Sequence, residues 1–412
     1  MDNIVILGTG QGGLQMAASL RQEGYAGAIT LIGDEPGLPY QRPPLSKAYM
    51  AEGNGEALLL KPHSFFEKAQ VSLIDGCRAV EIDRSAHAVT LADGRRIAYD
   101  YLILATGSRN LMPPLAGIEA PGVMGLRTLE DAERLRRALS DTRHAVVVGG
   151  GFIGLEFAAM ARKTGLAVTV VEAAPRLMAR AVSPAMSDAF LAKHRALGTD
   201  IRLSSPAAEI IRNGATGRAA GVRLMDGTAI DGDLVLLAVG VRPNSELAAE
   251  AGLTVDNGIV VDGTLRTSDP AISALGDVCS FPFAGRHIRL ESVQAAVDHA
   301  RHIARVLLKG ETASYCALPW FWSDQADWKL QIAGVALDPD EDISPARDTA
   351  IPLVLRFRQG TLISVETVND AGSHMAARNL IGCRKSLLAE HGFDLRAAMQ
   401  TVRQAQRQAV TA

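Results

Sequence analysis

Glycines recur in this sequence at a spacing that suits phosphate binding. The pattern G-x-G-x-x-G occurs twice, at Gly8, Gly10 and Gly13 and again at Gly149, Gly151 and Gly154. Each copy follows an apolar run and precedes a helical pattern. Glycines at this spacing permit a tight turn and let the backbone approach a pyrophosphate at the positive end of the helix. The sequence therefore predicts two dinucleotide-binding sites.

Acidic residues close the next predicted strand in both copies. Asp34, with Glu35 beside it, ends the first, and Glu172 ends the second. A carboxylate at this position accepts hydrogen bonds from ribose hydroxyls, whereas proteins that bind NADP usually place an arginine nearby for the 2′-phosphate. The next arginine after Glu172 is Arg176, beyond a proline, so we expect the second site to favour NADH over NADPH.

Two dinucleotide sites in one chain imply two dinucleotides. The economical pairing is a tightly bound FAD in the first site and a diffusible NADH in the second, with hydride passing between them. Two further turns fit this pairing. The turn Ala105, Thr106 and Gly107 would bring backbone close to the cofactor, and Asp277, after Gly276, would accept a hydrogen bond from a ribityl hydroxyl. An ordinary β-turn and a strand-end aspartate are the alternative interpretations.

The elements around the glycine patterns indicate the fold. Residues 3–35 and 144–174 each run through strand, turn, helix and strand, over about the 30 residues of a βαβ unit. Their apolar strands are typical of a parallel sheet covered on both faces. We predict an α/β fold with two Rossmann-like dinucleotide-binding domains plus an α+β carboxy-terminal domain. The expected boundaries are 1–111 and 239–318 for the two parts of the FAD domain, 112–238 for the NADH domain and 319–412 for the carboxy-terminal domain.

The composition of the chain excludes several functional classes. The 412 residues carry a net charge of −3 and no long basic block, which gives no support for nucleic-acid binding. The amino terminus enters a strand directly, and the longest apolar run, residues 145–155, is too short for a bilayer helix. We therefore expect a cytoplasmic protein that does not bind membranes.

Cysteine usage argues against disulfide chemistry. The 4 cysteines are scattered without a C-x-x-C spacing, which fits neither a zinc site nor a redox disulfide, and we expect no bound metal. A flavin disulfide reductase, or a CoA-disulfide reductase or NADH-oxidase type of enzyme, needs a cysteine that faces the flavin. The first cysteine here is Cys77, after the loop near position 40 where such an enzyme would carry one.

Several motifs together resemble one family, the FAD-dependent ferredoxin–NADH reductases of oxygenase systems. These motifs are the two glycine patterns, ATG (105–107) and the segments LPYQRPPLSK (38–47), TSDPAISALGD (267–277), RLESV (289–293) and PWFWSDQ (319–325). The resemblance covers essentially the whole chain and implies a glutathione-reductase-like fold. It implies that NADH reduces FAD and that FAD passes single electrons to a [2Fe–2S] ferredoxin, which feeds a haem monooxygenase or a Rieske-type oxygenase.

Two other functions are alternatives to the one that this resemblance implies. A monodehydroascorbate- or quinone-type NADH:acceptor reductase of the same fold stays open. A redox-responsive interaction protein, similar to the mitochondrial apoptosis-inducing flavoprotein, would be expected to carry a targeting segment and long basic insertions, and this sequence has neither. We expect a monomer or a weak dimer.

The resemblance also implies a set of cofactor contacts. For FAD these are Gly12, Asp34, Lys47, Val80, Arg127, Asp277 and Val293. The other matched residues expected to bind a cofactor are Arg42, Ile153, Gly240, Gly276, Glu291, Ser292 and Trp320. Gly12 stands where many relatives have alanine, which would give the pyrophosphate more room. Arg127 has an alternative role as a surface arginine that pairs with Glu130 or Asp131.

Lys47 and Glu156 are the residues that we expect to assist catalysis. The resemblance places Lys47 beside the flavin ring, and Glu156 is expected to reach the same place. A buried ammonium needs a partner, because an unpaired buried charge is costly. We therefore predict a Lys47–Glu156 ion pair; a solvated lysine and a helix-surface carboxylate are the alternative.

A basic stripe and two aromatic residues bear on the redox partner. Arg301, Arg305 and Lys309 follow at intervals of four in a predicted helix. They are either a solvated face or a docking patch for an acidic ferredoxin, which complementary charge would steer. Either Trp320 or Trp322 is expected near the flavin. His299 lies close to where relatives commonly carry glutamine, and its role is open.

Overall fold

The computed structural model describes residues 1–347, 349 and 351–411. The chain divides into two compact units. Unit 1 comprises Met1–Arg42, Asn54–Arg109 and Val241–Ala317, and unit 2 comprises Pro43–Gly53, Asn110–Gly240 and Leu318–Ala412. The boundary after Arg42 falls inside the proline-rich segment 38–47, so this segment contributes residues to both units. The four domain segments expected from the sequence stay predictions.

The core of unit 1 is a five-stranded parallel sheet with the strand order β19-β7-β1-β2-β3. Its strands are β1 (Asn3–Leu7), β2 (Ala28–Ile32), β3 (Val71–Ile74), β7 (Tyr101–Leu104) and β19 (Ile272–Ala274). Ile4, Val5 and Ile6 are fully buried, as a central strand covered on both faces requires. This sheet confirms the parallel α/β architecture predicted for the first half of the fold.

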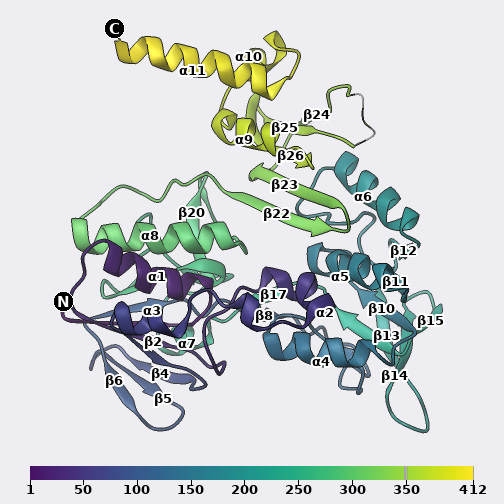
Figure 1. The fold of residues 1–412 in the computed structure, drawn as a ribbon, viewed down its shortest axis with the longest axis horizontal. Coiled ribbons are helices and arrows are strands. Elements are labelled where there is room, and N and C mark those ends of the chain that lie inside the picture. Colours follow the sequence, from purple (N-terminus) through teal and green to yellow (C-terminus); the bar gives the residue numbers. More distant parts are fainter. Residues whose placement is uncertain (348, 350, 412) are drawn as a thin grey trace. The chain divides into compact units, whose positions relative to one another are not determined.

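Helices α1 (Gln11–Gln22) and α8 (Val293–Lys309) pack against each other in unit 1 and lie side by side in Figure 1. Gly12 lies at this contact, because a Cβ there would stand 2.4 Å from Leu275 Cδ1 and 3.5 Å from Ala296 Cβ. The expectation that glycine at this position simply gives a pyrophosphate more room is therefore incomplete. Gly12 also lets α1 approach Leu275 and α8.

The remaining parts of unit 1 are small sheets and short helices. Two three-stranded sheets have the orders β4-β5-β6 and β18-β20-β21, and β17 pairs with β8 where the chain leaves and re-enters the unit. The elements are η2 (Glu56–Leu58), α3 (His63–Lys68), β4 (Ala79–Asp83), β5 (Ala88–Leu91), β6 (Arg96–Ala98), β8 (Ser108–Asn110), β17 (Val241–Pro243), α7 (Glu246–Glu250), β18 (Ile259–Val260), η3 (Gly276–Val278), β20 (Cys279–Phe283) and β21 (Arg286–Ile288).

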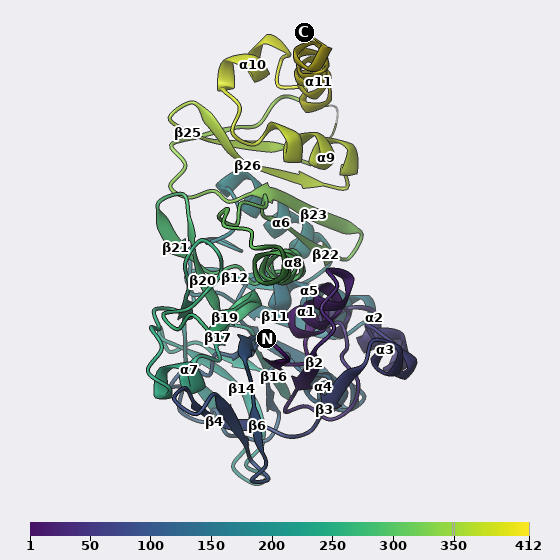
Figure 2. The ribbon, with the colours of Figure 1, turned by 90° about the vertical axis from the view of Figure 1, so that its left-hand side faces the viewer.

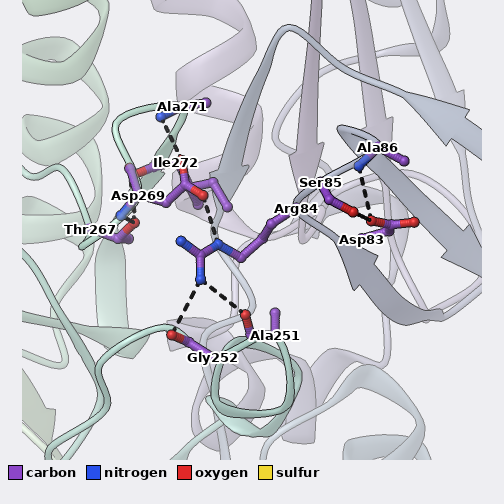
Figure 3. Close-up of polar contacts among 10 residues, drawn as sticks. All are labelled: Asp83, Arg84, Ser85, Ala86, Ala251, Gly252, Thr267, Asp269, Ala271 and Ile272. Carbon is purple, nitrogen blue, oxygen red and sulfur yellow. Dashed lines mark hydrogen bonds and ion pairs between the residues drawn. The ribbon is translucent and has the colours of Figure 1, made fainter.

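Arg84 ties the β4–β5 hairpin to the segment that leads to Asp277 (Figure 3). Its Nε lies 2.7 Å from Asp269 Oδ2, and its Nη1 donates to the carbonyls of Ala251 and Gly252, which follow α7. Asp269 Oδ1 also accepts from the Ala271 amide at 2.9 Å. The guanidinium therefore joins three stretches of unit 1 that are distant in sequence.

Removal of the Asp269 charge is expected to destabilise unit 1. Burial alone raises the pKa of Asp269, but the hydrogen bonds from Arg84 and Ala271 outweigh it and leave that pKa below its usual value. Asp269→Asn should lower the free energy of unfolding by about 1–2 kcal/mol at pH 7, allowing for screening at the partly exposed Arg84. A depressed pKa stabilises the fold fully above the unfolded value of about 3.9, and this contribution is lost progressively as pH falls from that value through the lower folded-state pKa.

Urea unfolding followed by circular dichroism at pH 7, 5 and 3.5 measures this effect, since the tryptophans all lie in unit 2. Asp93→Asn is the matched control, because it removes an exposed aspartate–arginine pair from the same hairpin region. Equal losses in the two variants, or a deficit in Asp269→Asn that is no smaller at pH 3.5 than at pH 7, would contradict the assignment.

Unit 2 repeats the architecture of unit 1. Its parallel sheet has the order β12-β11-β10-β16-β9, so β10, β11 and β16 correspond to β1, β2 and β7. A small antiparallel sheet, β13-β14-β15, shares a buried core with β10 and β16. The elements are η1 (Pro43–Ser46), α2 (Ala48–Glu52), β9 (Val123–Met124), α4 (Leu129–Leu139), β10 (His144–Val148), α5 (Phe152–Lys163), β11 (Ala167–Val171), α6 (Pro184–Ala196), β12 (Asp200–Arg202), β13 (Ala207–Arg212), β14 (Ala219–Leu224), β15 (Ala229–Asp231) and β16 (Leu234–Leu237).

The carboxy-terminal part of unit 2 is α+β, as predicted. Its antiparallel sheet has the order β22-β23-β26-β25-β24, and α9 packs on β23 and β26 (Figure 2). The elements are β22 (Trp320–Gln325), β23 (Trp328–Gly334), β24 (Glu341–Ile343), β25 (Val354–Arg358), β26 (Thr361–Val368), α9 (Ala371–Leu380), α10 (Lys385–Glu390) and α11 (Leu395–Thr411). Among the described residues, no helix has the length and apolar character needed to cross a membrane.

Candidate functional site

The first glycine turn is packed at both ends and open in the middle. Gly8 has φ +114°, and a Cβ there would stand 2.1 Å from the Ala105 carbonyl oxygen; a Cβ at Gly13 would stand 1.8 Å from the Gly8 oxygen. Gly10 differs, because its φ of −72° suits any residue and a Cβ would meet no protein atom within 4 Å. Neither backbone strain nor packing in the chain explains glycine at position 10. The position is open, as the predicted approach of a pyrophosphate requires.

Gly10 is the amino-terminal cap residue of α1, and no side chain caps the helix there. The first amides of a helix have no partners within the helix and attract anions. An open glycine at an uncapped helix start fits the pyrophosphate of a dinucleotide, as predicted for this turn.

A pocket opens beside this turn in unit 1. Its lining includes Thr9, Gly10, Glu35, Tyr40 and Arg42. Arg42 pairs with Glu35, which also accepts from the Tyr40 hydroxyl. Of the two adjacent acids proposed for the ribose, Glu35 lines this pocket, whereas Asp34 is exposed and does not.

Two predicted turns, Ala105–Gly107 and Gly276 with Asp277, belong to unit 1. The Ala105–Gly107 turn is fixed by Asn244, which donates to the Thr106 carbonyl and accepts from the Thr106 hydroxyl through its own carbonyl. Asp277 accepts a hydrogen bond of 2.9 Å from Ser108 Oγ. The residue after the ATG turn therefore contacts the aspartate proposed for the ribityl chain.

His299, whose role was open, supports the Gly276 turn. Its Nδ1 accepts from the Gly276 amide at 3.2 Å, and Gly276 has φ +71°. Burial, with a contribution from His302, lowers the pKa of His299 to about 3, so the ring is neutral and Nδ1 can accept. The helical pattern around His299 did not indicate this contact, because Gly276 lies 23 positions earlier in the chain.

Three other proposed cofactor residues of unit 1, Glu291, Ser292 and Val293, lie at the start of α8. Ser292 caps the helix by accepting from the Ala295 amide at 3.1 Å, and Val293 is its first residue. Glu291 is exposed and pairs with Arg289 at 2.7 Å. Val80, in β4, is 47% exposed.

Arg127, in unit 2, directly precedes α4. Its backbone amide donates to Asp131 Oδ2 at 3.0 Å as part of the cap formed by Thr128 and Asp131. The alternative partner Asp131 therefore contacts the Arg127 backbone. A role of Arg127 or of Val80 in FAD binding stays a prediction.

The second glycine turn has the same geometry as the first. Gly149 has φ +112°, and a Cβ there would stand 2.4 Å from the Ala238 oxygen; a Cβ at Gly154 would stand 2.3 Å from the Gly149 oxygen. Gly151 has φ −84° and no protein atom within 4 Å of its Cβ position. The middle glycine again faces open space, which leaves room for the predicted ligand.

Residues around this turn fit a ribose without a 2′-phosphate. Glu172 accepts from the Gly150 amide at 2.6 Å and from the Ala174 amide at 2.8 Å, which fixes its carboxylate beside the turn. The Arg176 guanidinium donates to the carbonyls of Ala179 and Val182. Ile153, near the start of α5, is 43% exposed, and Gly240 follows β16 with φ +116°.

Lys47 and Glu156 form the expected ion pair, and both belong to unit 2. Lys47 Nζ lies 3.1 Å from Glu156 Oε1 and 3.3 Å from Asp324 Oδ2. Glu156 is 5% exposed and accepts from the hydroxyls of Ser46 and Ser323, each at 2.6 Å. Burial raises the pKa of Glu156, while Lys47 and the two hydroxyls oppose that shift. The catalytic role of the pair stays a prediction.

Trp320 lies half-buried on β22. Its ring centroid is 5.6 Å from that of Trp322, and the Arg378 guanidinium stands 5.0 Å from the ring. His374 of α9 contacts it edge-on at 6.0 Å. Both candidate tryptophans thus belong to one aromatic cluster.

The predicted basic stripe lies on α8 and its cations are exposed. Arg301 lies 3.4 Å from Asp298, Arg305 lies 3.5 Å from Glu311, and Lys309 pairs with Glu23. Each cation therefore has an acidic neighbour, which reduces the net positive charge of the stripe.

Two protein-family models together match nearly the whole chain. Residues 2–300 match the model of the pyridine nucleotide-disulphide oxidoreductases, and residues 320–402 match that of the reductase carboxy-terminal domain. The chain belongs to the pyridine nucleotide-disulphide oxidoreductase family. Members of this family bind FAD and NAD(P)H, and the two open glycine turns fit these groups.

Individual relatives of this oxidoreductase are reductases. It is 47% identical to rhodocoxin reductase of Rhodococcus erythropolis, over 96% of this chain and 94% of the relative. It is 41% identical to a rubredoxin-NAD(+) reductase of Pseudomonas putida, over 89% of this chain and 95% of the relative. The structure of the ferredoxin reductase for the CYP199A2 system of Rhodopseudomonas palustris matches with a TM-score of 0.92 and 44% identity, over 97% of this chain and all of that one.

This oxidoreductase lacks a cysteine where disulfide-reducing members of its family would use one. All four cysteines are free thiols, and Cys279 is fully buried, which raises the pKa of its thiol. No cysteine precedes Cys77 in the sequence. The sequence therefore has no cysteine in the loop near position 40.

The sequence indicated Lys47 and Glu156 but not the side chains around them. Ser46, Ser323 and Asp324 contact the pair, and Gln325 contacts Ser323. The sequence does contain one sign of these contacts, the polar triplet Ser-Asp-Gln directly after three aromatic residues. Alternate residues of a strand share a face, so Ser323 and Gln325 lie on the same face as Phe321.

Proposed function

We propose that this protein is an NADH-dependent ferredoxin reductase. It would pass hydride from NADH to FAD and then deliver single electrons to a [2Fe–2S] ferredoxin that feeds a haem monooxygenase or a Rieske-type oxygenase. The observation that carries the proposal is the repeated turn with an open middle glycine, at Gly10 and at Gly151, in a chain that resembles ferredoxin reductases over nearly its full length.

Each proposed role follows from the local geometry. The turn at Gly10, together with Glu35 and Asp277, would hold FAD, and the turn at Gly151, with Glu172, would hold NADH. FAD can accept two electrons from NADH as a hydride and release them in two one-electron steps. Lys47 would place a positive charge where charge develops during hydride transfer, and Glu156 would hold the ammonium in position.

The protein is expected to prefer NADH. A carboxylate at Glu172 binds a free 2′-hydroxyl and repels a 2′-phosphate, and Arg176 is bonded to carbonyl groups. Glu172→Ala should lower kcat/KM for NADH by on the order of tenfold and narrow the preference over NADPH. Steady-state kinetics with both donors measures this. Arg176→Met is the control and should not reduce the residual NADPH activity; an unchanged NADH to NADPH ratio in Glu172→Ala would contradict the assignment.

The stripe Arg301, Arg305 and Lys309 is proposed to bind the ferredoxin. Arg301→Glu should raise the apparent KM for ferredoxin by about threefold to tenfold, more at low salt, because it replaces an attractive charge by a repulsive one. NADH–ferricyanide activity should be unchanged. Arg95→Glu, an exposed arginine of unit 1 that also has an aspartate neighbour, is the matched control. Equal effects of the two variants on ferredoxin would argue against docking at the stripe.

The identity of the acceptor can be tested directly. NADH oxidation by the FAD-loaded enzyme should be fastest with [2Fe–2S] ferredoxins when these are compared with rubredoxin, a quinone and monodehydroascorbate. Rubredoxin is the second candidate, because one close relative is a rubredoxin reductase. Faster turnover with the quinone or monodehydroascorbate than with any iron–sulfur or rubredoxin acceptor would overturn the proposal.

A further inference from the structure

The inward face of β22 carries polar groups in a fully buried position. Phe321 packs on Phe152 of α5, with ring centroids 4.6 Å apart. The next residues on this face, Ser323 and Gln325, are both 0% exposed. Buried polar side chains are costly unless their hydrogen bonds are satisfied. The partners of these two residues therefore need an explanation.

Four buried side chains of unit 2 form a continuous row. His194 Nε2 of α6 lies 2.9 Å from Gln325 Oε1, Gln325 Nε2 lies 3.2 Å from Ser323 Oγ, and Ser323 Oγ lies 2.6 Å from Glu156 Oε1. The second amide proton of Gln325 faces Met178 Sδ at 3.6 Å.

The direction of every proton in this row follows from its carboxylate end. An ionised carboxylate can only accept, so the Ser323 hydroxyl must donate to Glu156. The Ser323 oxygen then accepts from the Gln325 amide group, which turns the Gln325 carbonyl toward His194. His194 must therefore donate from Nε2.

His194 is suited to this role. Burial, with a smaller contribution from Lys193, lowers the pKa of His194, against the opposing hydrogen bond with Gln325, so the ring is neutral. Its Nδ1 is buried, with no hydrogen-bond partner among the described residues. A neutral imidazole carries one proton, and the geometry requires that proton on Nε2.

We infer that His194 and Gln325 are positioning residues that act through Ser323 on Glu156 and keep it in the ionised form that pairs with Lys47. Hydrogen bonds that all point the same way polarise one another, so the last donor is stronger than an isolated hydroxyl. The charged groups that face the row are Lys47 at Glu156, with Asp324 beyond it, and Lys193 next to His194. Only one part of this inference, the effect of the row on hydride transfer, rests on the proposed function.

The protonation of His194 is the first test. ¹⁵N NMR of histidine-labelled, FAD-loaded protein, assigned with His194→Gln, reports which ring nitrogen carries the proton. The expected result at neutral pH is the Nε2–H tautomer. A proton on Nδ1, or a charged imidazolium, would overturn the inference. This measurement needs neither NADH nor ferredoxin, so it can fail while the proposed function stands.

The effect on Glu156 is the second test. In ¹³C-carboxyl NMR, with the signal assigned by Glu156→Gln, Gln325→Leu should raise the pKa of Glu156 by about one unit. Gln325→Glu keeps the side-chain shape but cannot donate to Ser323, so it should raise that pKa as well and charge His194. Lys193→Met removes an ion pair with Asp327 next to the row and should leave the pKa unchanged.

Kinetics complete the test. The pH profile of FAD reduction by NADH should shift with the Glu156 pKa in the Gln325 variants and not in Lys193→Met. An unshifted Glu156 pKa in folded Gln325→Leu or Gln325→Glu, or an equal shift in Lys193→Met, would show that Gln325 does not act on Glu156.

Discussion

Lys47→Met is expected to slow FAD reduction by NADH on the order of hundredfold, the usual cost of removing one preorganised electrostatic group from a reaction site. It should also lower the free energy of unfolding by about 3 kcal/mol at pH 7, because Glu156 is left as an unpaired buried charge. Stopped-flow absorbance of the flavin measures the rate, and urea unfolding followed by tryptophan fluorescence of unit 2 measures stability.

The destabilisation should depend on pH with a defined sign. Without Lys47, burial holds the pKa of Glu156 above its unfolded value of about 4.3. The folded state then binds a proton more tightly than the unfolded state, so stability is lost as pH rises above that value and recovers at acidic pH. The double variant Lys47→Met/Glu156→Gln should recover most of the stability and lose this pH dependence.

Lys193→Met is the matched control for Lys47→Met. Lys193 is similarly buried, but its partner Asp327 is exposed, so loss of that pair should cost less than about 1 kcal/mol. Unchanged FAD reduction in Lys47→Met, with the protein folded, would remove Lys47 and Glu156 from the mechanism.

Gly10→Val should weaken FAD binding by roughly hundredfold without destabilising the protein that lacks FAD. The backbone at Gly10 suits an L-residue, and a Cβ there meets no protein atom within 4 Å, so the added side chain starts into the space proposed for the pyrophosphate. An overpacking cost of about 3 kcal/mol corresponds to roughly hundredfold weaker binding. Isothermal titration of FAD-free protein with FAD measures this affinity.

Gly13→Ala separates the ligand effect from a folding effect. Its Cβ would stand 1.8 Å from the Gly8 oxygen, so this variant should lose stability even without FAD. Thermal unfolding of the FAD-free variants should therefore distinguish the two, with Gly10→Val close to wild type. FAD affinity in Gly10→Val that equals wild type would place the pyrophosphate elsewhere.

Local patterns in the sequence identified much of this site. The two glycine turns and the strands around them could be predicted because their geometry depends on neighbouring residues, and the Lys47–Glu156 pair followed from matched motifs. The sequence could not show that Glu35 rather than Asp34 contacts Tyr40 and Arg42, because that contact depends on tertiary packing. The binding of ribose by Asp34 or Glu35 stays a prediction.

Contacts between distant segments were also beyond the sequence. The His194–Gln325 and Ser323–Glu156 hydrogen bonds join residues more than a hundred positions apart and depend on how β22 lies against α5 and α6. The division of LPYQRPPLSK after Arg42 is a property of tertiary packing. The prolines indicated a stiff segment, and the structure adds that its second half holds Ser46 and Lys47 against Glu156.

The most direct test of the proposed function is the stoichiometry of electron delivery. FAD-loaded enzyme is reduced anaerobically with one equivalent of NADH and mixed in a stopped-flow instrument with excess oxidised [2Fe–2S] ferredoxin, while flavin and ferredoxin absorbance are followed together. A ferredoxin reductase should reduce two ferredoxin molecules per NADH, at a rate that saturates with ferredoxin concentration. Ferredoxins that stay oxidised while a quinone reoxidises the flavin rapidly would contradict the account.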